Sequence, residues 1–417
     1  MVNANDFCGV CDSDIINAAI AAREADGIVV IPPRAVDGER SWWSLDRAIL
    51  LPSNTTVVLQ NCKLKLSDAS RDNFFRTANA GIGIEDPAPV ENIHIRGEGK
   101  VVLEGADHPR ATGDGGKTLA NPCPYEVEDL LRLAPWIPEE RRAPDKLNFW
   151  DRHIHTFGTD AGKPGESQNG DWRNIGVLFA NCKNFSMSGF AVVCAHGWGI
   201  SMEACSDGRV ERIRFDACMS KMIDGMRQNM ENQDGVNLRN GCHDIVVSDI
   251  TGCTGDDVVA LTAIADQNYL PGGSFCTTHV MHNDWSRREA DIHDVIVRNI
   301  VATSDLCHIL RMLPCECHIY NAIVDGIVDT AKELKHYGAL VLGEGDGSYG
   351  RNLPDGLHHV TISNVISYAP SCINIFGYLT DSVISNVVNR NPGKPVLRVR
   401  RENGMRNVLT SNLVTTE

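Results

Sequence analysis

The sequence has no long apolar run and no excess of positive charge. No stretch approaches the about 18 consecutive apolar residues that a membrane-spanning helix needs, so an integral helical membrane protein is excluded. Lys and Arg number 39 against 54 Asp and Glu, which gives a formal net charge of −15. A chain of this charge is repelled by phosphate backbones and by anionic bilayers. We therefore expect neither a nucleic acid nor a membrane as a partner.

Signal-peptide features and compact cysteine spacing are also lacking. Residues 1–6 show neither the basic nor the apolar segment of a leader. The 15 cysteines are an odd number and are scattered, unlike those of small disulfide-bonded secreted domains. We expect a cytoplasmic protein, or a secreted one if a leader was removed from the natural chain. No four-ligand zinc pattern is present, so no metal and no other cofactor is expected.

Helical periodicity is scarce. The one persuasive helix runs from Asp14 to Ala25, is rich in alanine and stops before Gly27. Doubly wound α/β folds need a helix between successive strands, and leucine-rich repeats need regular leucines with a helical return segment. The sequence supports neither of these folds.

A short pattern recurs instead: a polar residue, apolar residues at alternate positions, and then Asn, Asp or Gly. Copies stand at Asn92–Gly97, Asn184–Gly189, Asp244–Asp249, Asp294–Asn299, His318–Asn321, His359–Asn364, Ser382–Asn386 and Asn407–Asn412. Several successive copies are 23 to 25 residues apart, which is typical of a solenoid, and the alternation is typical of β-strands. We therefore expect an all-β parallel β-helix whose N-terminal end is capped by the helix.

Longer spacings and insertions interrupt the repeat. The intervals from Ile245 to Val295 and from Ile319 to Val360 are expected to hold one or two coils with a loop. Residues 106–172 are rich in Pro, Gly and charge and predict a long inserted loop or subdomain within a single domain of residues 1–417. Such loops could wall a binding site or support a homo-oligomer.

Two acidic motifs lie one repeat apart. Aligning Asp234 with Asp257, an offset of 23 residues, places Val236 beside Val259. Strands of neighbouring coils lie about 4.8 Å apart, so we expect these carboxylates and that of Asp256 on one small patch. An Asp beside a Gly is most often a turn former, but two such sites in register favour catalysis. Crowded carboxylates raise at least one pKa, which lets one group donate a proton while another accepts one.

The two motifs resemble those of glycoside hydrolase family 28, the polygalacturonase family, whose pattern is Asn-Thr-Asp-Gly followed one coil later by Gly-Asp-Asp. The resemblance is clearest over residues 174–264. It implies the right-handed, single-stranded parallel β-helix of the pectin-lyase superfamily and an inverting hydrolase. By this resemblance, Asp256 is similar to the general acid, Asp234 and Asp257 are similar to the groups that activate water, and Asn232 matches the motif's asparagine.

The sequence departs from the family pattern at its basic residues. The family has a His-Gly pair one coil after the aspartate pair, and the nearby candidates here are His279 and His282, neither followed by Gly. The family's Arg-Ile-Lys is matched only by Arg311, with Leu313 in the place of the lysine. His308 stands three residues before Arg311, and we expect a regular strand to put the two on opposite faces.

Tryptophan rings suit the C–H faces of sugars. Trp198 lies just before the coil of Asp234, and Trp285 lies in the loop after Asp257. The expected substrate-binding residues are therefore Asn232, Arg311, Trp198, Trp285, His279 and His282.

Together these features predict an inverting glycoside hydrolase that cleaves an O-glycosidic bond in a plant or microbial oligosaccharide or polysaccharide. A pectin-related glycan fits, whereas plain homogalacturonan does not, because a single Arg without the Lys remains for its carboxylates. Two alternatives stay open. One is a uronate lyase or epimerase of the same fold, in which the aspartates hold Ca²⁺. The other is a non-catalytic carbohydrate-binding β-helix.

Overall fold

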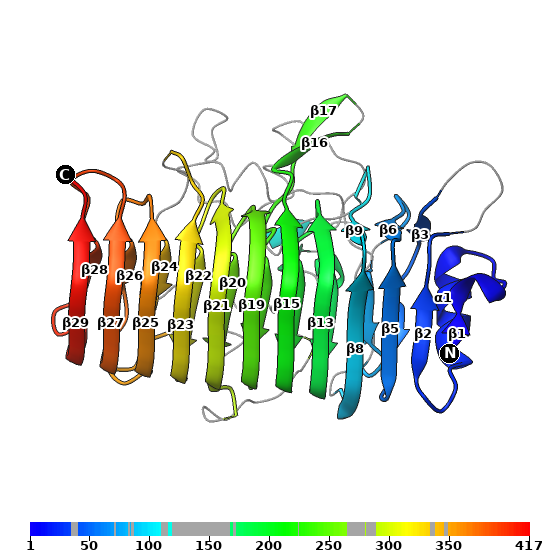
Figure 1. Ribbon diagram of the computed structural model, residues 1–417, viewed down its shortest axis with the longest axis horizontal. Coiled ribbons are helices and arrows are strands. Elements are labelled where there is room, and N and C mark those ends of the chain that lie inside the picture. The colour runs from blue at the N-terminus through cyan, green and yellow to red at the C-terminus, as the bar shows by residue number, and fades with distance from the viewer. Residues whose placement is uncertain are drawn as a thin grey trace.

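The chain winds into a right-handed parallel β-helix whose coils stack along the long axis of the molecule (Figure 1). This confirms the predicted fold class. The computed structural model describes residues 1–34, 41–70, 72–81, 84, 87–109, 116–118, 167–169, 172–223, 225–264, 280, 289–333, 338–345 and 349–417. Within these ranges, no helix has the length and apolar character of a membrane span.

One sheet is built from the long strand of each coil. Its main path contains β1 (Val2–Asn3), β2 (Ile28–Ile31), β5 (Thr55–Gln60), β8 (Val90–Glu98), β13 (Cys182–Val193), β15 (Ser206–Asp216), β19 (His243–Thr254), β21 (Ile292–Ser304), β23 (Ile319–Asp329), β25 (Leu357–Ser367), β27 (Leu379–Asn389) and β29 (Met405–Thr415), paired in that order. Off this path, β3 (Trp43–Leu45), β6 (Lys63–Leu66) and β9 (Val102–Glu104) pair in series and join β13.

The second sheet is built from the short strand of each coil and carries the candidate site. Its strands are β4 (Ile49–Leu51), β7 (Phe75–Thr77), β12 (Val177–Ala180), β14 (Ile200–Glu203), β18 (Val236–Arg239), β20 (Val259–Ile264), β22 (Leu310–Cys315), β24 (Leu340–Leu342), β26 (Ile373–Ile375) and β28 (Leu397–Val399). Two antiparallel pairs lie outside the solenoid: β10 (Gly116–Thr118) with β11 (Ser167–Asn169), and β16 (Ser220–Ile223) with β17 (Met226–Asn229).

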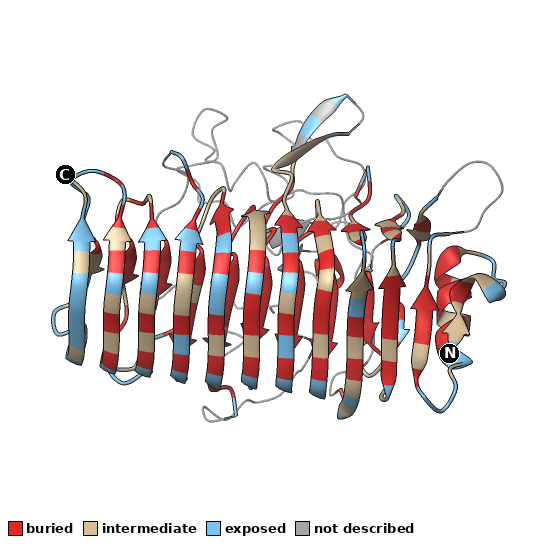
Figure 2. Cartoon of the chain, in the orientation of Figure 1, coloured by how far each residue is buried: buried red, intermediate tan, exposed pale blue. Residues whose placement is uncertain are grey.

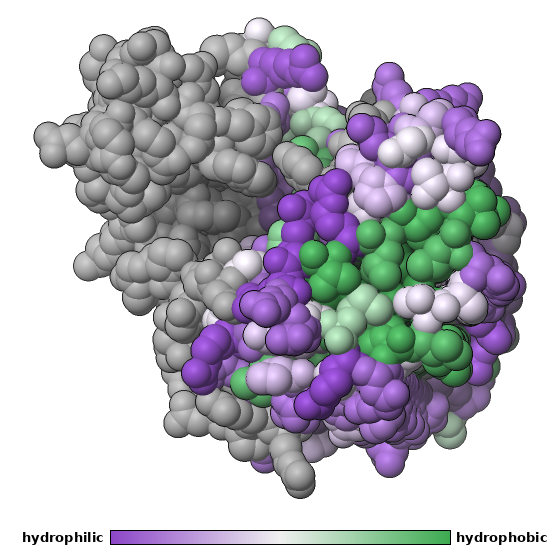
Figure 3. Space-filling view, turned by 90° about the vertical axis from the view of Figure 1, so that its left-hand side faces the viewer, coloured by the Kyte–Doolittle hydropathy of each residue, from purple (hydrophilic) through white to green (hydrophobic). Residues whose placement is uncertain are grey.

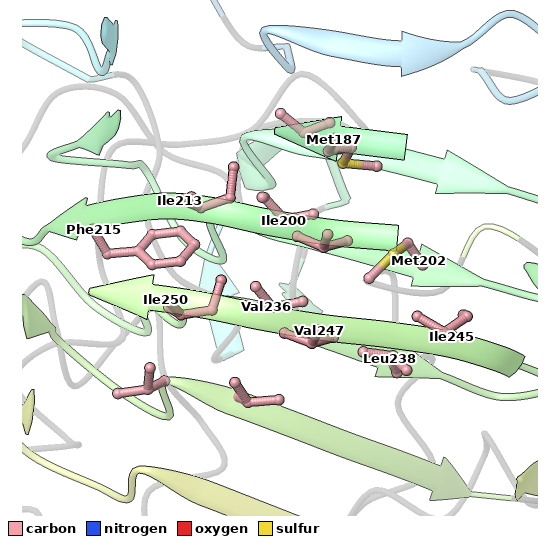
Figure 4. Close-up of a cluster of buried hydrophobic side chains, with 14 of the residues drawn as sticks. Met187, Ile200, Met202, Ile213, Phe215, Val236, Leu238, Ile245, Val247 and Ile250 are labelled. Atoms are coloured by element: carbon pink, nitrogen blue, oxygen red, sulfur yellow. The ribbon is translucent and has the colours of Figure 1, made fainter. Parts of the chain in front are cut away.

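Alternation along each strand sends every second side chain between the two sheets. Figure 2 shows the resulting bands of buried and exposed residues along the long strands. Figure 4 shows the apolar side chains meeting in the interior, among them Met187, Ile200, Phe215, Val236 and Ile250. Each such side chain contributes roughly 1.5–3 kcal/mol when fully buried, so the stacked interior is the main source of stability.

The polar residue that begins or ends each repeat bends the strand. Asn92 and Asn184 have φ values of 58° and 53°, in the left-handed region that Asn tolerates better than most residues. Their side chains also pair between coils: Asn184 Nδ2 donates to Asn92 Oδ1 at 2.7 Å, and Asn92 Nδ2 donates to Asn54 Oδ1 at 2.8 Å. The polar residue of the repeat therefore forms a bend and a ladder of Asn side chains between coils, in addition to flanking a strand.

The register resolves the two long intervals. Ile245 pairs with Val295, and Ala322 pairs with Val360. Each interval is thus a single coil with a loop, and not two coils. Most of the insertion of residues 106–172 lies outside the described residues, and so does most of a second insertion, residues 266–290, in the loop after Asp257. The division into one domain with an inserted subdomain therefore stays a prediction.

The N-terminal end is covered by a helix, as predicted. α1 (Asp12–Ala21) follows the short 3-10 turn of Ala4–Asp6 and buries Ile16 and Ile20 in the core. The predicted end at Ala25 is wrong. The helix ends four residues earlier because the chain must turn into β2, and it does so through Gly27, whose φ is 69° and where a Cβ would meet Asn54 O at 2.4 Å.

The C-terminal end has no comparable cover within the described residues. Figure 3 faces this end and shows apolar side chains gathered on it. Leu409, Val414 and Val399 are 65%, 48% and 40% exposed, although they belong to strands of the last coil. This coil has a neighbour on one side only, as the end of a solenoid must.

Candidate active site

The two acidic motifs meet where β18 and β20 begin. Val236 pairs with Val259, so Asp234 and Asp257, each two residues earlier, occupy equivalent places in adjacent coils. The N–H of Gly235 donates to the carbonyl of Asp257 at 2.8 Å and holds the two coils together there. The structure therefore places Asp234 and Asp257 side by side in the backbone register that the offset of 23 residues predicted.

Asp256 stands beside this pair and is held by its backbone. Its carbonyl accepts hydrogen bonds from Ser304 Oγ at 2.7 Å and Thr254 Oγ1 at 2.6 Å. One of its carboxylate oxygens accepts the N–H of Asp257 at 2.8 Å. The Cys307 thiol is hydrogen-bonded to the Asp256 carboxyl group, and one atom from each of Asp256, Asp257 and Cys307 lies within 4.8 Å of the others. The cluster is thus tight and fixed.

Burial governs the protonation of the two adjacent aspartates. Asp256 is 8% exposed and Asp257 is 3% exposed. Burial, together with the neighbouring charge of Asp257, raises the pKa of Asp256 to about 6. Burial also raises the pKa of Asp257 to about 6, against the opposing effect of Arg311. The pair can therefore hold a proton close to neutral pH, where ordinary surface aspartates have lost theirs.

Arg311 extends from β22 toward Asp257. Its Nη1 atom lies 3.8 Å from Asp257 Oδ2, and its Nη2 atom is hydrogen-bonded to Glu344. The N–H of His308 also donates to Asp257 Oδ1, at 3.0 Å. These contacts favour a negative charge on Asp257, and the proton of the pair is then best placed on Asp256.

The expected placement of the His308 and Arg311 side chains on opposite faces stays a prediction. His308 precedes β22 and contacts Asp257 through its backbone N–H, whereas Arg311 approaches the same carboxyl group with its side chain. Leu310 pairs with Val259, which puts His308 one coil after Asp257, where the family pattern has its histidine. Its Nδ1 atom lies 3.1 Å from the carbonyl of Gly338. Aligning Val259–Leu261 with Leu310–Met312 across the insertion would have revealed this position.

Of the remaining substrate-binding candidates from the sequence, the structure describes Trp198 and Asn232. Trp198 is only 9% exposed and packs against the guanidinium of Arg239, 4.6 Å from the ring centroid, so little of its ring is open to a ligand. Asn232 lies in the left-handed region, with φ of 48°, in the turn that leads to Asp234. His279, His282 and Trp285 lie outside the described residues.

Two further residues belong to the site. Cys307 contacts Asp256, and Glu344 pairs with Arg311. Among the described residues, Asp256, Asp257 and Cys307 are also the group close enough to hold a metal ion. A neighbouring guanidinium already offsets the charge of Asp257, which disfavours a cation at that carboxylate.

Comparison with known proteins identifies the fold. No protein-family model and no curated protein sequence matches the chain. Among solved structures, it is similar to the polygalacturonase from Erwinia carotovora ssp. carotovora, with a TM-score of 0.55 and 11% identity over 99% of this chain and 93% of that one. The fold is that of the polygalacturonases.

Proteins of other kinds share this β-helix. PfbA, a surface adhesin of Streptococcus pneumoniae, matches with a TM-score of 0.55 and 12% identity over 98% of this chain and 89% of that one. A tailspike protein mutant of E. coli bacteriophage HK620, in complex with a pentasaccharide, matches with a TM-score of 0.53 and 15% identity over 97% and 66%. Likeness at these identities concerns the fold, and function has to be argued from the site.

Proposed function

We propose that this chain is an inverting glycoside hydrolase that cleaves an O-glycosidic bond in a plant or microbial oligosaccharide or polysaccharide. The observation that carries the proposal is the buried pair Asp256 and Asp257, with both pKa values raised to about 6. An aspartate that only forms a turn gains nothing from such burial. A proton donor that works near neutral pH requires it.

The contacts assign a role to each carboxyl group. Asp256 keeps the proton and donates it to the glycosidic oxygen as the bond breaks. Asp257, next to Arg311 and the N–H of His308, stays ionised and accepts a proton from water together with Asp234 of the preceding coil. The substrate is then attacked from the side opposite the acid, as inversion requires.

The chemistry of the cluster favours hydrolysis over a calcium-dependent lyase or epimerase. Ca²⁺ takes six to eight oxygen ligands. Here a thiol, that of Cys307, is part of the cluster, and the guanidinium of Arg311 lies 3.8 Å from Asp257. A non-catalytic binding module gives no reason for two buried carboxyl groups with raised pKa values. A cytoplasmic location and assembly through the insertions belong to the same proposal.

A glycan digest tests the proposal. Wild-type protein is incubated with mixed plant and microbial glycans, with and without a chelator, and both reducing ends and unsaturated products are measured. We expect new reducing ends that do not depend on the metal. The Asp256→Asn variant should lose them, whereas the matched Asp249→Asn variant, changed at an exposed aspartate bonded to Asn299, should keep them. Unsaturated products, or binding without turnover, would contradict the proposal.

A further inference from the structure

Cys194 and Cys218 form a pair of thiols at the ends of neighbouring long strands. Their side chains are in hydrogen-bond contact. The coils bring them together because the N–H of Cys194 donates to the carbonyl of Asp216, the last residue of β15, at 3.0 Å. Both cysteines are half-buried, so the pair is accessible to a small reagent.

The surroundings make Cys194 the more reactive of the two. The hydrogen bond from Cys218 lowers the pKa of the Cys194 thiol, and the positive charge of Lys221 lowers it further. The Lys221 ammonium group is held nearby by its hydrogen bond to the carbonyl of Ala106. The contact with Cys194 and burial raise the pKa of Cys218. A low-pKa, partly exposed thiol next to a resolving thiol is the arrangement of redox-active cysteine pairs.

A direct chain of hydrogen bonds joins this pair to the aspartates. The side chain of Gln233 accepts the N–H of Cys218 at 3.2 Å and donates to its carbonyl at 2.6 Å. Gln233 is 2% exposed and directly precedes Asp234. Its own carbonyl accepts the N–H of Gly255 at 2.9 Å and that of Asp256 at 3.3 Å. A shift of Cys218 therefore moves the residue that positions both acidic motifs.

The same segment is the base of a projecting hairpin. β16 and β17 extend beyond the ends of the long strands (Figure 1). The hairpin closes at its base through Met230 N–H, which donates to the carbonyl of Met219 at 3.0 Å, and through Gln233 Nε2, which donates to the carbonyl of Met230 at 3.2 Å. Cys218 lies one residue before this closure, so a covalent bond there would fix the hairpin to the preceding coil.

We infer that Cys194 and Cys218 are a reversible disulfide site that controls the candidate active site; its effect on turnover rests on the proposed hydrolase. The oxidant is a low-molecular-weight disulfide. The Cys194 thiolate attacks one of its sulfurs, forms a mixed disulfide and releases the first thiolate. The Cys218 thiolate then attacks the Cys194 sulfur and releases the second. Two cysteine thiols are oxidised by two electrons, the reagent is reduced to two thiols, and the two cysteine protons go to them.

Oxidised glutathione tests the chemistry on the folded full-length chain. After incubation, free thiols are alkylated, and the cross-linked peptides are mapped by mass spectrometry. We expect a bond between Cys194 and Cys218 that dithiothreitol removes. The Cys194→Ser and Cys218→Ser variants should each lack it, and the matched Cys253→Ser variant, changed at a half-buried cysteine whose carbonyl accepts the Ala217 N–H, should retain it. A bond that maps to Cys253, or glutathione left on Cys194, would overturn the inference.

Two further readouts test control of the site. Hydrogen exchange over residues 217–235 should slow when the bond forms, and turnover should fall about threefold or more and recover with dithiothreitol. Slowed hydrogen exchange with unchanged turnover in an active enzyme would show that the disulfide does not control the candidate active site. If the protein cleaves no glycan at all, the proposed hydrolase function is wrong. The cross-link map and the hydrogen exchange still show whether the disulfide forms.

Discussion

The guanidinium of Arg311 lies 3.8 Å from the carboxylate of Asp257 on the adjacent coil. The pairing of β20 with β22 holds the two side chains there, so we expect the contact to persist in solution. Arg311 lowers the pKa of Asp257, and its removal should raise that pKa. In the Arg311→Gln variant, the acidic limb of the pH–rate profile should therefore move to higher pH, because the base ionises later.

The matched control for this shift is Arg298→Gln, which removes an exposed guanidinium from β21. Its profile should coincide with that of the wild type. An Arg311→Gln profile whose acidic limb stays in place, or moves to lower pH, would show that Arg311 does not act on the base.

The Asp256→Asn substitution should abolish most of the turnover. The amide keeps the shape of the carboxyl group and loses the proton, and loss of general acid catalysis costs on the order of 10²–10⁴ in rate. Initial rates on the substrate found in the glycan screen measure the loss, and circular dichroism verifies the fold. An Asp256→Asn enzyme with nearly wild-type activity would place the acid elsewhere.

The same substitution should stabilise the protein, in a way that depends on pH. The folded pKa of Asp256, about 6, lies above its ordinary value of 3.8, so the folded chain binds more protons than the unfolded chain between these values. Wild-type stability therefore falls as pH rises from 4 to 6. At pH 8, Asp256→Asn should unfold with a free energy higher by up to about 3 kcal/mol, and at pH 4 the difference should vanish. Denaturant titrations at both pH values measure it, with Asp249→Asn as the control that shows no such difference.

Hydrolysis should invert the anomeric centre. NMR of the first-formed product identifies the anomer before mutarotation. Inverting enzymes leave roughly 6.5–9.5 Å between acid and base for the water. One carboxylate oxygen of Asp256 and one of Asp257 lie within 4.8 Å of each other, so the space for the water depends on Asp234 of the neighbouring coil, which shares the activation of water with Asp257. Retention in the first product would mean that one of the carboxylates acts as a nucleophile.

Plain homogalacturonan should be a poor substrate. Arg311, the one basic residue that matches the family's pair, is already engaged by Asp257 and Glu344, and Leu313 stands in the place of the lysine. The net charge of −15 also repels long polyanions. We expect faster cleavage of neutral or sparsely charged oligosaccharides, near chain ends. Rapid loss of viscosity of homogalacturonan, at a rate above that on neutral glycans, would refute this.

The period of the repeat was enough to predict the coil and the pairing of Asp234 with Asp257. Both depend on local alternation and on an offset that no insertion disturbs between these residues. The same reasoning failed at His308, because a long insertion separates it from Asp257 and hides the register. It also failed at the end of the helix, where the close approach of Gly27 to Asn54, a tertiary contact, decides where the chain turns.

Contacts between side chains that lie far apart in the sequence left no signal in it. Cys307 meets Asp256 across 51 residues, and Glu344 meets Arg311 across 33. A single cysteine and a glutamate in a Gly-rich loop are common on any surface, and only the stacked coils give them partners. For Trp198 the sequence predicted a contact that the structure does not favour: the ring expected to bind a sugar packs against Arg239 instead.

The last coil has no cover within the described part of the chain, and this sets the direction in which the molecule should unravel. A coil in a solenoid is held by its neighbours, and the one that contains β28 and β29 has a neighbour on one side only, whereas α1 closes the opposite end. Fraying that begins there must strip away β28 and β29, then β26 and β27, then β24 and β25, before it reaches the strand of Arg311. On slow heating, loss of β-structure at this end should therefore run ahead of loss of catalysis.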